Sequence, residues 1–178
     1  MNNKKLVTEM GRIDRDAFAQ SQKLPLVVVL DNVRSLHNVG SVFRTSDAFR
    51  VECIMLCGIT ATPPSAEIHK TALGAEDVVD WKYYESTMDA VAELRSQGYR
   101  IYSIELCQGS IALQDFVTAP GERYAVVLGN EVKGVQQDVV DASDGAIEIP
   151  QFGTKHSLNV SVTAGMVIWE FAKKLGLV

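Results

Sequence analysis

The stretch LPLVVVLD, Leu24–Asp31, decides the fold class of this chain of 178 residues. It is a continuous apolar run that ends in an aspartate, which is typical of a parallel strand covered on both faces. Apolar runs at Val51–Cys57, Tyr99–Leu106 and Tyr124–Leu128 follow it, separated by segments with helical spacing. This alternation predicts an α/β domain whose mainly parallel sheet is flanked by helices.

Helices are predicted between these runs. Apolar residues recur at helical spacing in Val39–Phe49, and Ser86 is a predicted N-cap of a helix through Gln97 that Gly98 closes. The remaining predicted elements are short helices at Glu67–Leu73 and near Val135–Ala142, strands at Val78–Tyr84 and Ala146–Ile149, and a final helix from about Ser157 to Leu175. The final helix is apolar on nearly every side, so we expect it to be buried partly within the chain and partly at a homodimer interface.

The bulk composition is that of one ordinary domain. Hydrophobic residues make up 47% and charged residues 22% of the chain. Residues 1–22 are polar and predict a short N-terminal arm or helix, which leaves 23–178 as the single folded domain. No run approaches the roughly 18 apolar residues of a membrane span, and no apolar signal region follows the first basic residues. We therefore expect a cytoplasmic protein with no membrane partner.

The charge is unevenly distributed. Residues 1–50 hold eight lysines and arginines against five acidic residues, which leaves −8 to the remainder of a chain whose net charge is −5. The net charge argues mildly against a protein that coats nucleic acid. We expect a polyanion to meet the N-terminal face, although an ordinary solvated surface explains the asymmetry equally well.

The cysteines and histidines show no pattern of a metal site. Cys53, Cys57 and Cys107 form no Cys-x-x-Cys pair, and the three histidines have no ligand spacing. We expect free thiols and no bound metal.

Two glycine-bearing turns each follow an apolar run in the last third of the chain. They are LGNEVKGV, Leu128–Val135, and IPQFGTKHSLNVS, Ile149–Ser161. Neither Gly-x-Gly-x-x-Gly nor a Walker pattern follows the first strand, which argues against an ordinary dinucleotide site. In an open α/β sheet a ligand binds at the carboxyl ends of the strands, which are expected here at Asp31, Leu106, Gly129 and Ile149.

A third segment, NVGSVFR at Asn38–Arg44, places an amide and a guanidinium six residues apart. The planar guanidinium of Arg44 suits phosphate or ribose oxygens, but a surface ion pair with Asp47 or Asp31 explains it equally well. Taken singly, the turn at Gly129 is also explained as a plain strand-to-helix connection, and Ser157 as a helix N-cap.

Together the three segments resemble the motifs of the SpoU/TrmH-type family of the SPOUT superfamily of RNA methyltransferases. NVGSVFR is similar to the first motif, LGNEVKGV to the second, and IPQ followed by SLNVSV to the third. The resemblance covers roughly residues 25–175. The chain departs from the family at Gln151, where members often have methionine, and its Phe152, Lys155 and His156 are interpreted as residues that tune substrate choice.

The resemblance implies a C-terminal deep trefoil knot that holds S-adenosylmethionine largely through backbone groups. Generic topology rules would discard a knot, since knots are very rare. The implied cofactor-binding residues are Glu105, Leu106, Leu128, Gly129, Asn130, Glu131, Gly134, Ile149, Pro150, Gln151, Ser157, Leu158 and Asn159.

The implied reaction is methylation of a ribose 2′-hydroxyl in tRNA or rRNA. The implied catalytic residues are Arg44, Asn38, Glu131, Ser157 and Asn159. A guanidinium with a pKa above about 12 is a poor base at neutral pH. We therefore favour an Arg44 that stays charged and stabilises the developing alkoxide, with an RNA phosphate orienting it.

Two alternatives remain. One is a knotted methyltransferase that modifies a base nitrogen, and the other is a non-catalytic RNA-binding protein that retains the fold. With no long RNA-binding domain recognised in the sequence, we expect a compact target such as a tRNA arm more than rRNA.

Overall fold

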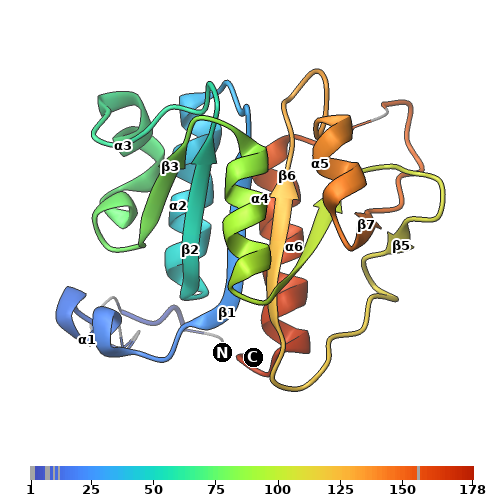
Figure 1. Ribbon diagram of the computed structural model, residues 1–178. Coiled ribbons are helices and arrows are strands. Elements are labelled where there is room, and N and C mark those ends of the chain that lie inside the picture. Colours follow the sequence, from blue (N-terminus) through green and yellow to red (C-terminus); the bar gives the residue numbers. More distant parts are fainter. Residues whose placement is uncertain (1–2, 7–8, 10, 12, 156) are drawn as a thin grey trace.

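The computed structural model describes residues 3–6, 9, 11, 13–155 and 157–178. Its centre is a seven-stranded sheet of order β3-β2-β1-β6-β4-β7-β5 in which every neighbouring pair is parallel (Figure 1). The strands are β1 (Leu24–Asp31), β2 (Val51–Cys57), β3 (Trp81–Tyr84), β4 (Tyr99–Ile104), β5 (Ile111–Ala112), β6 (Arg123–Leu128) and β7 (Gly145–Glu148). The predicted α/β class with a parallel sheet is confirmed.

Helices cover both faces of the sheet. They are α1 (Arg15–Gln20), α2 (Leu36–Ala48), α3 (Ala66–Ala72), α4 (Thr87–Ser96), α5 (Gln137–Ala142) and α6 (Val160–Lys174), with a short 3-10 helix, η2, at Ala75–Asp77. Leu26, Val28 and Leu30 of β1 belong to the core cluster that includes α2 and α6. Val27 and Val29 belong to the cluster that includes α4 and α5. The unbroken apolar run of β1 is explained by these two covered faces.

The register of the central strands brings four strand ends to one edge of the sheet. Leu128 at the end of β6 pairs with Leu30 of β1 on one side and with Ile104 of β4 on the other. Ile104 in turn pairs with Ile147 of β7. The turns that follow β1, β4, β6 and β7 therefore lie next to one another, although they come from distant parts of the chain.

Several predicted boundaries shift in the structure. Helix α2 begins at Leu36 because Ser35 caps it, with the Ser35 side chain accepting a hydrogen bond from the Asn38 N–H. Strand β3 begins at Trp81 and not at the predicted Val78, because the chain first leaves the 3-10 helix η2 at residues 75–77. The two-residue strand β5 was not predicted. The predicted N-cap of α4 at Ser86 is confirmed, and the helix ends at the C-cap Gln97, which is followed by Gly98 with φ +81°.

The N-terminal segment 1–22 contains the short helix α1, whose Phe18 is buried in the core cluster. Residues 1, 2, 7, 8, 10 and 12 of this segment lie outside the described residues. The separation of an arm from the domain stays a prediction. In the described part of the chain no helix has the length and apolar character to cross a membrane.

Candidate functional site

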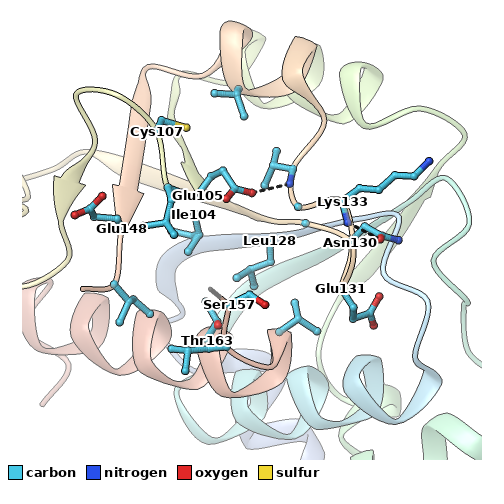
Figure 2. A pocket seen from close by; sticks show the side chains of 18 of the residues that line it. Ile104, Glu105, Cys107, Leu128, Asn130, Glu131, Lys133, Glu148, Ser157 and Thr163 are labelled. Atoms are coloured by element: carbon cyan, nitrogen blue, oxygen red, sulfur yellow. Dashed lines mark hydrogen bonds between the residues drawn. The ribbon is translucent and has the colours of Figure 1, made fainter. Parts of the chain in front are cut away.

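A cavity of about 470 Å³ opens at the shared carboxyl edge of the sheet (Figure 2). Its volume lies within the range of small-molecule sites, about 300–1,000 Å³. The lining comes from the ends of β4, β6 and β7 and from the segment that enters α6: Ile104–Cys107, Leu128–Val135, Gln137, Val140, Ile147–Ile149, Gln151, Ser157, Leu158, Val160 and Thr163. This is the edge at which an open α/β sheet binds its ligand.

The Glu131 carboxylate joins the β6 turn to the start of α2. Its oxygens accept hydrogen bonds from the backbone N–H groups of Arg34 and Ser35, both at 3.0 Å. Desolvation opposes ionisation of this carboxyl, but these N–H donors and Asn38 outweigh it and lower the pKa of Glu131. Glu131 is thus held as a carboxylate at the N-terminus of a helix, where negative charge is favoured.

Asn38 connects Glu131 to the start of α6. Its Nδ2 donates to Glu131 Oε1 at 3.1 Å, and its Oδ1 accepts from Asn159 Nδ2 at 3.2 Å. Asn159 is also the N-cap of α6, since its Oδ1 accepts from the N–H of Ser161 at 2.9 Å. One hydrogen-bonded chain of three side chains therefore ties the three sequence motifs together.

The turn after β6 is closed upon itself. Asn130 and Gly134 exchange two backbone hydrogen bonds of 3.0 and 2.9 Å, and the Asn130 side chain accepts from the N–H groups of Val132 and Lys133. The Asn130 Nδ2 donates to the Asn32 carbonyl at 2.7 Å, which fastens the turn to the end of β1. The turn is therefore a fixed wall of the cavity.

Both glycines of this turn are required by close contacts. A Cβ at Gly129 would lie 2.1 Å from the Gly134 carbonyl carbon, and a Cβ at Gly134 would lie 2.2 Å from Glu105 Oε2. Gly134 also has φ +70°, which side chains rarely adopt. Glu105 Oε2 accepts from the Val135 N–H at 3.0 Å, so the end of β4 is joined to the same turn (Figure 2).

Eleven of the thirteen residues predicted to bind a cofactor line the cavity, and Pro150 and Asn159 do not. Asn159 contributes through the cap and the Asn38 contact instead. The explanation of Ser157 as an N-cap is wrong, because α6 begins three residues later and Ser157 lines the cavity. Among the five predicted catalytic residues, Glu131 and Ser157 line the cavity, and Asn38 and Asn159 bond to Glu131 or to each other.

Arg44 is the predicted catalytic residue that the structure does not bring to the cavity of its own chain. It is exposed on α2 and is absent from the lining. Arg44 comes six positions after Asn38 in the helix. This spacing corresponds to a rise of about 9 Å along the helix axis and to a rotation of one full turn and most of a second. The alternative prediction of a surface ion pair between Arg44 and Asp31 is wrong. Asp31 is buried, and its carboxylate accepts hydrogen bonds from Thr87 and Gln136 at 2.6–2.8 Å.

The sequence prediction did not include several lining residues, among them Cys107, Glu148 and Thr163. Glu148 and Cys107 lie at or just beyond strand ends, so the strand-end rule could have found them. Thr163 lies one turn into α6, and no motif marked it. His156 lies outside the described residues.

The charges of the lining favour a ligand with positive charge. The lining includes three acidic residues, Glu105, Glu131 and Glu148, and one basic residue, Lys133. Such a set repels a polyphosphate and suits a cationic or zwitterionic molecule. Within the described ranges, no group of three His, Cys, Asp or Glu side chains could hold a metal ion, and Cys53, Cys57 and Cys107 are free thiols.

A sequence model described as the SpoU rRNA Methylase family matches residues 25–169. The chain belongs to this family. It is 30% identical over 158 residues to the tRNA (guanosine(18)-2′-O)-methyltransferase of Aquifex aeolicus, covering 88% of this chain and 72% of that protein. It is 29% identical over 170 residues to the 23S rRNA (guanosine-2′-O-)-methyltransferase RlmB of Vibrio parahaemolyticus, covering 96% and 68%.

A solved structure shares the same fold. The AdoMet-bound rRNA methyltransferase from Sinorhizobium meliloti superposes with a TM-score of 0.78 at 26% identity, over 89% of this chain and 59% of that one. The chain thus spans about three fifths to three quarters of the length of these relatives.

Proposed function

We propose that the protein transfers a methyl group from S-adenosylmethionine to a ribose 2′-hydroxyl of an RNA. One observation carries the proposal: the Glu131–Asn38–Asn159 hydrogen-bond chain joins three distant motifs beside the cavity. Relatives named as tRNA and rRNA 2′-O-methyltransferases support the reaction type. The proposal includes the thirteen predicted cofactor residues and the five predicted catalytic ones.

The cavity fits S-adenosylmethionine in size and in charge. The bound cofactor supplies a reactive methyl on a sulfonium, and the sulfonium and the amino group are both cationic. The carboxylates of Glu105, Glu131 and Glu148 complement them, and the fixed β6 turn offers backbone groups. The chain's own tasks are then to align the hydroxyl with the methyl and to exclude water.

Arg44 is assigned the stabilisation of the developing alkoxide, in its charged form. Since Arg44 lies outside the cavity of its own chain, the proposal places it at the cavity of a second copy in a homodimer. The exposed apolar side chains of Val162, Met166 and Trp169 form a stripe along α6, and Trp169 packs edge-on against Phe49, just past α2, at 5.6 Å. A partner seated on this stripe would contact α2 as well.

A trefoil knot in the C-terminal part belongs to the same proposal. The chain leaves β7, which lies between β4 and β5, and must pass the ends of β4 and β6 to bring Asn159 to Asn38. The closed turn after β6 and the segment after β4 lie along that route. Pulling a single molecule from both ends would test it, since a tightened knot leaves the unfolded chain shorter than its contour length.

The substrate is proposed to be structured RNA, with a tRNA arm ahead of rRNA, and residues 1–22 are proposed to help position it. The direct test is transfer of labelled methyl from S-adenosylmethionine to tRNA and rRNA, followed by alkaline hydrolysis. A methylated ribose blocks cleavage at its 3′ side, so label should appear in alkali-resistant dinucleotides. Label in mononucleotides would show base methylation, and cofactor binding without any transfer would show a non-catalytic protein.

A further inference from the structure

The segment between β7 and α6 carries a large aromatic side chain that the fold leaves in solvent. Phe152 is 97% exposed, the highest value among the exposed large hydrophobic residues. It directly follows Gln151, which lines the cavity, and Gly153 beside it has open space around its Cβ position. The segment arches beyond the sheet at the same edge as the β6–α5 turn (Figure 1).

Both ends of this segment are anchored. Ile149 packs against the core cluster at one end, and Asn159 caps α6 at the other. Ser157 and Leu158, just before that cap, line the cavity together with Gln151. Phe152 therefore belongs to a segment that contacts the cavity on both sides of it, at Gln151 and at Ser157.

Three exposed cations come from segments that border the cavity. Among the described residues, seven lysines and arginines form salt bridges, and none of these seven lines the cavity. Arg34, Lys133 and Lys155 have no carboxylate within 4 Å in the described part of the chain, and all three are exposed. The Arg34 N–H bonds to Glu131, Lys133 follows two residues later, and Figure 2 shows its side chain pointing away from the cavity.

We propose that Phe152 is a stacking platform for a nucleobase of the RNA, and that Arg34 and Lys133 across the mouth of the cavity bind flanking phosphates. This rests on the proposed function and names the part of the substrate that the chain holds outside the cavity. Aromatic side chains stack on any base, and neighbouring cations neutralise the backbone. In this proposal Phe152, Arg34 and Lys133 form a rim whose exposed cations suit a polyanion.

This rim differs from the lining of the cavity in the kind of ligand that it suits. The lining is acidic and suits a cation, whereas the rim carries an aromatic ring and unpaired cations and suits a nucleotide. A base held on Phe152 would place its neighbouring ribose over the entrance beside Gln151 and Ser157. Phe152 is thus a positioning residue for the RNA and does not touch the methyl group.

The experiment compares two fluorescein-labelled probes with equal numbers of phosphates, an adenosine 12-mer and an abasic ribose 12-mer. The wild-type protein should bind the adenosine probe at least fivefold more tightly. Phe152→Leu should remove that preference, and Phe152→Trp should restore it. The double variant Arg34→Gln/Lys133→Gln should keep the preference but lower the slope of log affinity against log salt by about 1.4.

Three outcomes would overturn the inference. They are equal binding of both probes by the wild-type protein, an unchanged preference in Phe152→Leu, and loss of a dimer in Phe152→Leu during sedimentation, which would place Phe152 between two copies. The proposed function is contradicted by a different result. If the base preference depends on Phe152 but no RNA is methylated, the proposed reaction is wrong and the stacking platform stands. Conversely, if Phe152→Leu methylates RNA with an unchanged KM for RNA, the stacking platform is wrong and the proposed reaction stands.

Discussion

The side chains of Asn38 and Asn159, 121 positions apart in the sequence, are joined by a hydrogen bond of 3.2 Å. The same Asn38 side chain donates to Glu131 at 3.1 Å, so each of its two polar atoms has one partner from another motif. Asn38 is 9% exposed, and a buried amide deprived of one partner costs about 1–3 kcal/mol. The arrangement of the three motifs therefore depends on this one residue.

Asn38→Ala should lower methyl transfer at least tenfold, because Glu131 and Asn159 lose their common partner. Stability should fall by about 1–2 kcal/mol in urea unfolding. Ser86→Ala is the matched control, since it removes the N-cap of α4 and lies outside the cavity. That variant should lose about 1 kcal/mol and keep its activity. Equal activity loss in both would mean that stability alone explains the effect.

The pKa of Glu131 gives a pH dependence with a definite sign. Because the folded-state pKa is lowered from 4.5, the carboxylate contributes stability above that value and loses it as the pH falls through the folded pKa. Glu131→Gln should therefore be less stable than wild type at pH 7, and the difference should shrink below pH 4. Urea unfolding of both proteins from pH 3 to 7 measures it. A difference that stays constant over this range would contradict the assignment.

Gly134→Ala should weaken S-adenosylmethionine binding at least tenfold, because the new Cβ would collide with the Glu105 carboxylate. Gly98→Ala is the control, since Gly98 also has a positive φ but has no heavy atom within 4 Å of its Cβ position. Both variants should lose about 1 kcal/mol of stability from backbone strain. Isothermal titration calorimetry should show weakened binding only for Gly134→Ala. Weakened binding in both would assign the effect to strain.

Arg44→Ala should bind S-adenosylmethionine within twofold of wild type and lose most methyl transfer, since Arg44 is outside the cavity and is assigned to the alkoxide. Arg100→Ala, an exposed arginine on β4, should retain activity. Mixing Arg44→Ala with Gly134→Ala should recover activity if one copy supplies the arginine to the cavity of the other. No recovery from a mixture shown to contain mixed dimers would place both residues in one chain.

Met166→Glu should convert a homodimer into monomers, because it places a charge in the exposed apolar stripe of α6. Sedimentation velocity measures the change. Glu170→Gln on the same helix is the control, since it faces Lys173 and Lys174 and lies beside the stripe. A wild-type protein that sediments as a monomer, or a dimer that survives Met166→Glu, would remove the stripe from the interface.

Much of the fold was predictable because the parallel sheet leaves a strong sequence signal. The bounds of β1 and β2 agree with the apolar runs at 24–31 and 51–57, since strands covered on both faces are apolar without interruption. Strand β5 was missed because two residues give no pattern, and residues 78–80 of the predicted strand at 78–84 instead form the connection from η2 to β3. The resemblance, not periodicity, predicted the family.

The convergence of the motif segments was also predictable, since the carboxyl ends of neighbouring parallel strands share an edge. The detailed contacts were not. Ser157, Asn159 and Ser161 are all good caps, and only the route of the chain past Asn38 selects Asn159. The direction of Arg44 depends on where α2 begins, and the cap at Ser35 moved that start from Val39 to Leu36.

The central position of β6 has a consequence for the protein as it is synthesised. Strand β4 pairs only with β6 and β7, both of which come later in the chain, and one edge of β1 pairs with β6 alone. On the ribosome, β1, β2 and β3 can therefore pair early, but one edge of β1 stays open and β4 has no partner strand until Leu128 has emerged. Unpaired edges of this kind are templates for pairing with other chains, so the interval before β6 emerges is the one in which this chain is most exposed to aggregation.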